Sequence, residues 1–172
     1  MSGSLVLIQE TTVSSEVASV TLTGIDSTFN VYQVNYFDVQ PSDDAQKLKI
    51  RFTVSGTPDT STNYTKAQLV TSSASGHVEQ TSSNQSSIDS LDQGGTGTQE
   101  TLQGVHYLFN FSNASEFSFV TYEGTAISSA SQLNARQGGG VLKEAQANDG
   151  INYSFASGNI ASGKFKLFGL AK

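Results

Sequence analysis

The sequence has no cysteine, no tryptophan, only two prolines and few charged residues among its 172 positions. Without cysteine the protein has no disulfide, no thiolate ligand for a metal and no cysteine nucleophile. Apolar burial and backbone hydrogen bonds must therefore hold the fold, in an oxidising or a reducing compartment alike. The missing tryptophan also removes a common platform for sugar rings.

Positive charge is scarce as well: there are nine lysines and arginines against fifteen aspartates and glutamates, and the net charge is −6. No window concentrates the basic residues, as proteins that bind the phosphate backbone do, so we expect no nucleic-acid partner. The apolar run at the N-terminus covers only Leu5–Ile8, and no basic residue precedes it. This run is too short for a signal peptide or a membrane span, so we expect neither export nor a membrane partner.

Aromatic residues, in contrast, are plentiful: ten phenylalanines and six tyrosines are spread along the chain. A chain of this length buries roughly two-thirds of the surface that it exposes when unfolded. These features favour one folded domain over residues 1–172 rather than disorder. The polar remainder is rich in Ser, Thr, Asn and Gln, which predicts an uncharged surface that is rich in hydroxyl groups.

The dominant hydrophobic period is two. Apolar residues alternate with polar ones over Leu48–Val54, and the same alternation recurs over Val105–Phe111 and Ile151–Phe155. This pattern is typical of strands with one face in a core and one in water. If Val105 and Tyr107 point into the core, His106 lies on the solvent face.

Further strands are expected at 5–9, 17–22, 32–39, 64–70, 117–122 and 165–170. The apolar phase changes after Tyr36 and again after Leu167, which predicts at each place a bulge or a strand that changes its neighbour. Residues 126–135 come nearest to a helical pattern, but their serines favour a turn. The expected fold is an all-β, single-domain, jelly-roll-like sandwich of about 8–10 short antiparallel strands. The stretch 71–101 has almost no large apolar residue and predicts a long polar excursion.

No motif indicates a catalytic, cofactor or metal site, so we expect a protein that is not an enzyme. Gly94–Gly97 and Gly138–Gly140 lack the Lys-Ser/Thr pair of a phosphate loop, and they favour turns or close packing of the backbone. Asp89 and Asp92 offer the oxygen ligands that calcium prefers, but no ligand spacing supports a site and a turn role is favoured. A carbohydrate-active enzyme is a third class, for which no nucleophile, base or metal set can be assembled.

Segments 7–15, 24–32, 39–42, 48–55, 104–110 and 157–170 follow one another in a recognisable order. In this order they resemble a family of small virion structural proteins of marine tailed bacteriophages. The resemblance covers nearly the whole chain and is weakest over 71–101. These segments are strand and turn patterns rather than chemical motifs, so the resemblance implies a β-sandwich in a virion more strongly than a particular role.

Within that virion setting the favoured hypothesis is a capsid decoration (cement) protein, made in the host cytoplasm and bound to the outer surface of the capsid. Its partners would be the major capsid protein and sister subunits in a homotrimer. The alternative is a host-recognition module of a tail or head fibre, which would bind glycans through polar loops. In the first case we expect residues 5–9 and 71–101 to supply much of the contact with the shell or with sister subunits.

Overall fold

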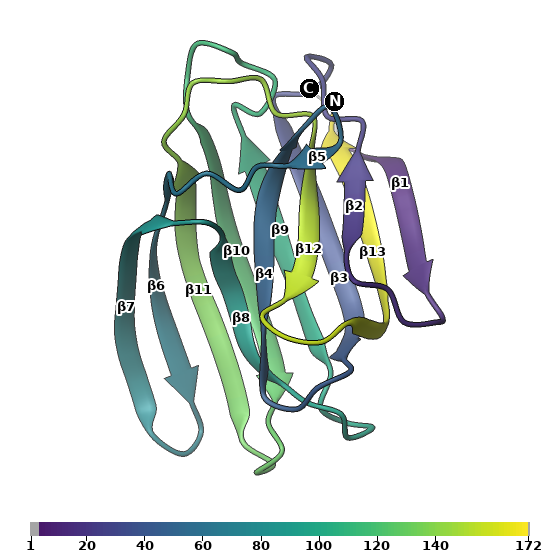
Figure 1. Ribbon diagram of the computed structural model, residues 1–172, viewed down its shortest axis with the longest axis vertical. Helices are drawn as coiled ribbons and strands as arrows, with labels where there is room; N and C mark the ends of the chain where they lie inside the picture. The colour runs from purple at the N-terminus through teal and green to yellow at the C-terminus, as the bar shows by residue number, and fades with distance from the viewer. Residues whose placement is uncertain (1–3, 172) are drawn as a thin grey trace.

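The computed structural model describes residues 4–171, and it folds these residues into thirteen antiparallel strands in two sheets that pack as a sandwich (Figure 1). The larger sheet has eight strands in the order β1-β13-β3-β9-β10-β11-β6-β7. Their bounds are β1 Leu5–Val13, β13 Ile160–Leu170, β3 Val31–Pro41, β9 Leu102–Phe109, β10 Ser118–Ile127, β11 Leu133–Leu142, β6 Tyr64–Ser72 and β7 Gly76–Gln85. The predicted all-β sandwich is confirmed.

The smaller sheet covers one face of the larger one and contains five strands. They are β2 Val20–Thr23, β12 Gly150–Phe155, β4 Gln46–Val54, β5 Thr57–Pro58 and β8 Ile88–Gly94. β12 lies between β2 and β4, and β8 pairs with β4 on its other side. The chain crosses repeatedly between the sheets, from β1 to β2, β3 and β4 in turn, so neighbouring strands in space are mostly distant in sequence. No helix within residues 4–171 is long and apolar enough to cross a membrane.

Alternating apolar residues form the interior, as the sequence predicts for β4 and β12. Leu48, Ile50 and Phe52 are buried, and so are Ile151 and Tyr153. The bulge predicted after Tyr36 is also present. The register between β3 and β9 shifts between Tyr36 and Val39, and Asp38 has a φ of 50°.

The predicted orientation of β9 is wrong. His106 and Leu108 are fully buried, whereas Val105 and Tyr107 lie on the outer face of the larger sheet and are half-buried. Alternation gives the period of a strand but not which phase faces the core. In β9 both phases carry apolar side chains, so the more apolar face was mistaken for the inner one.

The segment 71–101 is not one long loop. It forms the end of β6, then the edge strand β7, then β8. The side chains of β7 are almost all exposed, which explains why the strand has no apolar signal, whereas Ile88 and Leu91 of β8 are buried. Together with β5 and β11, these strands raise the total above the predicted eight to ten.

The inward phase of β13 does not change after Leu167 as predicted. Phe165 and Leu167 point inward and Gly169 continues on that face, so Phe168 and Leu170 belong to the outer face. The register against β3 shifts earlier, between Ile160 and Lys164, whereas the register against β1 does shift at Leu167 and Phe168, because β1 has an extra residue there between Leu7 and Gln9. Gly169 is the inward residue after Leu167, but it has no side chain because the ring of Phe29 occupies that space. The sequence pattern therefore shows no apolar residue at this inward position.

Burial lowers the pKa of His106 from 6.5 to about 3. The folded protein therefore holds this ring neutral, with Nδ1 2.7 Å from the Tyr153 hydroxyl, while the unfolded chain takes up a proton below its ordinary pKa. The contribution to stability is complete above about pH 6.5 and is lost as the pH falls toward 3.

We predict that the free energy of unfolding falls by roughly 3 kcal/mol between pH 7 and pH 4.5 through His106 alone. His106→Gln cannot be protonated and keeps a polar partner for Tyr153, so most of this loss should disappear. Urea unfolding at both pH values measures it. An equal loss in the variant and in the original protein would contradict the assignment to His106.

Candidate functional site

The outer face of the eight-stranded sheet carries a row of apolar side chains near one end of the strands. Val31, Phe109, Phe119 and Val141 stand directly opposite one another on β3, β9, β10 and β11. Their neighbours along the strands are buried in the sandwich, which turns these four side chains outward. Leu5 of β1 faces Leu170 of β13 in the same way and extends the row to the edge of the sheet.

A second row lies two residues further along each strand and is also uncharged. It crosses all eight strands, each member opposite the next in the ladder. Its members are Leu7, Phe168, Gln33, Tyr107, Thr121, Gly139, Ala67 and Thr81. We call the two rows together the apolar stripe. Leu5 and Leu7 are 47% and 51% exposed, and Phe119 is 43% exposed, so water covers large apolar side chains here.

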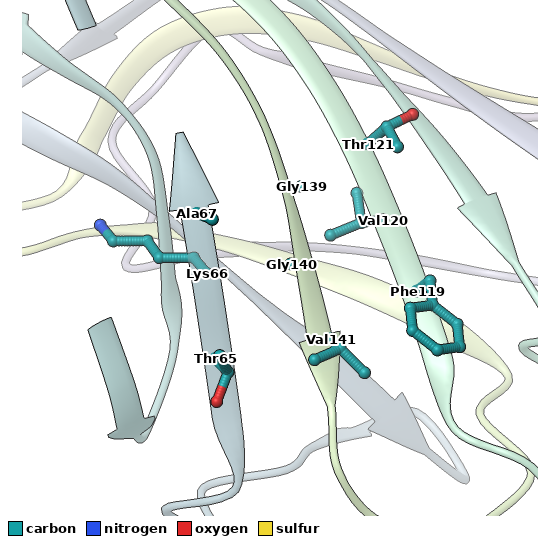
Figure 2. A pocket seen from close by; sticks show the side chains of 9 residues that line it. All are labelled: Thr65, Lys66, Ala67, Phe119, Val120, Thr121, Gly139, Gly140 and Val141. Carbon is teal, nitrogen blue, oxygen red and sulfur yellow. The ribbon is translucent and has the colours of Figure 1, made fainter. Parts of the chain in front are cut away.

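The stripe contains a shallow hollow of about 380 Å³ between β10 and β6 (Figure 2). Its floor is Gly139, with Thr121 opposite on one side and Ala67 on the other. Phe119 and Val141 form the wall toward the end of the strands. A Cβ at Gly139 would meet only the backbone oxygen of Val120, at 3.4 Å, so the hollow exists because this outward position has no side chain.

Charged residues on this face gather toward the other end of the strands. The Lys166 ammonium lies 3.1 Å from one carboxylate oxygen of Glu10, and that of Lys164 lies 3.8 Å from the other. Such exposed ion pairs add little to stability, typically about 0–1 kcal/mol. The half of the face that contains the stripe is therefore uncharged, whereas the other half carries these charges together with exposed apolar residues such as Phe37, Leu69 and Leu133.

Both edges of the larger sheet are open in the part of the chain that the structure describes. β1 forms one edge and β7 the other, and each pairs with a single neighbour. β1 has a bulge between Leu7 and Gln9 but contains no lysine or proline, the residues that commonly protect an edge from pairing with another chain. The two segments that we expected to make contacts, 5–9 and 71–101, thus include these two edges, and their role in contacts remains a prediction.

A buried charged cluster joins β8 to the larger sheet. The Lys66 ammonium lies 3.3 Å from the Asp89 carboxylate, and the Arg136 guanidinium pairs with Asp92. Lys66 and Arg136 are almost completely covered, and burial lowers the pKa of Lys66. These pairs replace the turn role that we expected for Asp89 and Asp92. No group of three metal-ligating side chains is found within residues 4–171.

The Gly94–Gly97 segment ends β8 in a turn, as the sequence predicts. The backbone nitrogen of Gly97 donates a hydrogen bond to the Glu100 carboxylate (3.1 Å), and that of Gly95 donates to the Glu100 carbonyl. A negative side chain thus occupies the place where a phosphate loop would hold its anion. The turn is a structural feature of the strand end.

The sequence matches no protein-family model and no curated protein. The geometry therefore carries the functional argument, and its most distinctive feature is the apolar stripe. In the sequence, the stripe is visible as the alternation of the apolar residues Val105, Tyr107 and Phe109, which the pattern alone predicts to face the core. A surface of this kind binds another surface by burying apolar area.

We predict that Asp92→Asn lowers the free energy of unfolding by about 3–5 kcal/mol, because it leaves the buried Arg136 without its counter-charge. The double variant Asp92→Leu with Arg136→Met removes both charges and should recover most of that loss. Denaturant unfolding of the original protein and both variants gives the comparison. If the double variant is no more stable than Asp92→Asn, the charge pairing is not the cause.

Proposed function

We infer that the protein is a non-enzymatic virion structural protein of a bacteriophage, a capsid decoration protein that binds the outer shell through the apolar stripe. The observation that carries the proposal is the uncharged apolar half of the outer sheet face, with Leu5, Leu7 and Phe119 exposed. The resemblance to small virion proteins of marine phages supports the virion setting.

The size of the stripe suits the centre of such an interface. Eight strands spaced about 4.8 Å apart give a stripe about 35 Å long. A stable interface buries about 800 Å² on each partner, with an apolar centre and a polar rim. The hydroxyl and amide side chains around the stripe supply the rim. A decoration protein then stabilises the shell because rupture has to break these contacts as well.

The proposed partners are the major capsid protein and two sister subunits. The open edges β1 and β7 lie on opposite sides of the sheet, so one edge of a subunit can meet the other edge of the next (Figure 1). Head-to-tail contacts of this kind close into a ring when the rotation between subunits allows it. This geometry supports the proposed homotrimer.

Copy number tests the proposal directly. A decoration protein should be present in hundreds of copies per particle, near parity with the major capsid protein or at a simple fraction of it. Quantitative mass spectrometry of purified virions measures this ratio. A few to some tens of copies would instead indicate a tail or fibre location, and absence from the particle would overturn the virion assignment.

The stripe can be tested with a pair of matched substitutions. Phe119→Ser should weaken binding to particles that lack the protein by roughly tenfold or more, because it removes an aromatic anchor from the centre of the interface. Leu133→Ser is the control, since Leu133 is 48% exposed but lies at the far end of β11. Co-sedimentation with the particles gives both affinities. Equal binding by the two variants would remove the stripe from the interface.

A further inference from the structure

We propose that a hollow at the end of the sandwich binds a neutral saccharide, an activity that goes beyond the decoration of a shell. The hollow is lined by the loop that leads into β3 and the loop that follows β9. Both loops lie at the end of the sandwich where the described chain begins and ends (Figure 1). Its volume is about 250 Å³. This is slightly below the range of roughly 300–1,000 Å³ for pockets of drug-sized ligands, so it suits one sugar ring.

The polar lining offers hydrogen bonds that the described part of the protein leaves unused. Ser27 and Asn30 come from the first loop, and Asn110 and Ser112 from the second. Within residues 4–171 none of these four side chains has a hydrogen-bond partner, and all four residues are exposed. Amides and hydroxyls both donate and accept, which matches the paired donor and acceptor character of sugar hydroxyls.

Asn113 and three aromatic residues, Phe29, Tyr32 and Phe111, complete the lining. Phe29 is half-buried and packs edge-on against Tyr32, with ring centroids 5.7 Å apart. Phe111 is buried and lies 4.4 Å from the ring of Phe52. A sugar ring has an apolar C–H face inside its rim of hydroxyls, and Phe29 is the ring of this lining that is exposed enough to contact it.

The absence of charge narrows the ligand class. No lysine, arginine, aspartate or glutamate is among the described residues that line the hollow. A phosphate or carboxylate would find no counter-charge here, and a purely apolar ligand would leave the amides unpaired on desolvation. An uncharged polyhydroxyl ring satisfies both conditions.

The first loop is held in place before any ligand arrives. The Asp26 carboxylate accepts hydrogen bonds from the Thr28 backbone nitrogen (2.8 Å) and the Tyr32 hydroxyl (3.0 Å). These hydrogen bonds lower the pKa of Asp26 and keep the carboxylate charged. The turn therefore holds the backbone of Ser27 and Asn30 in place, which lowers the ordering cost of binding.

The second loop is fixed by its backbone. The Asn110 carbonyl accepts hydrogen bonds from the backbone nitrogen of Asn113 (3.2 Å) and the hydroxyl of Ser118 (3.4 Å). Asn110 itself has a φ of 60°, a left-handed conformation that asparagine tolerates better than most residues. Glycine adopts this conformation readily, so Asn110→Gly removes the side chain without a change in the backbone.

The test is a titration of the full chain, followed by NMR, with the methyl glycosides of glucose, galactose, mannose and N-acetylglucosamine. Inorganic phosphate and a blocked triglycine peptide are the comparison ligands. We expect at least one glycoside to shift the resonances of Asn30 and Asn110, and the comparison ligands to leave them unchanged. No shift with any of the glycosides, or equal shifts with phosphate or the peptide, would overturn the proposal.

The deciding variant is Asn110→Gly, which removes the amide and keeps the left-handed backbone. It should weaken binding of the glycoside roughly tenfold or more. Asn84→Gly is the matched control because Asn84 also has a left-handed φ, of 57°, and lies exposed on β7 at the far edge of the sheet. If the two variants bind equally well, the hollow is not the site. The outcome is independent of shell binding, which Phe119 tests.

Discussion

Tyr36 of β3 crosses the interior of the sandwich, and its ring ends over Gly104 and Gly124 on the neighbouring strands β9 and β10. A Cβ at either glycine would collide with the tyrosine side chain. The ring also packs against His106 and Tyr153, with centroids 5.1 Å and 6.2 Å away. Since the chain has no disulfide, the spacing of the sandwich depends on this contact, in which rings from both sheets, Tyr36 and Tyr153, pack together above glycines of the larger sheet.

One part of the interior is polar, and it lies beneath β8. Away from the aromatic centre, β8 is the strand of the smaller sheet that covers β10, β11 and β6. The inward residues of the larger sheet there include Lys66, Gln68 and Arg136, and a hydrogen bond of 2.8 Å joins the Gln68 side-chain amide to the Tyr122 hydroxyl. Ion pairs of Lys66 with Asp89 and of Arg136 with Asp92 thus fasten β8 to the larger sheet. Apolar packing alone would leave these buried charges without partners.

Sequence patterns found the strands whose two faces differ in polarity, such as β4 and β12. They missed β11, because its inward residues Asn134 and Arg136 are polar and Gly138–Gly140 reads as a turn. Those glycines are inside the strand, and Ile88 of β8 occupies the space beside Gly140. β7 was missed for the opposite reason, since neither of its faces is buried. Patterns of polarity report burial, and they fail where a strand buries polar groups or buries nothing.

β9 faces the core with the residues opposite to those that the sequence predicts, and this difference has a consequence for binding. A strand with two apolar faces in a two-layer sandwich has one face that the described chain does not cover, and this is the surface at which we propose that another molecule binds. The polar hollow borders that surface directly, because Asn30 precedes Val31 and Asn110 follows Phe109. The alternation that builds the stripe ends where the loops begin, and the side chains change there from rings to amides. One end of the sandwich therefore carries two chemically distinct surfaces, and each can be removed by substitution without disturbing the packing around Tyr36.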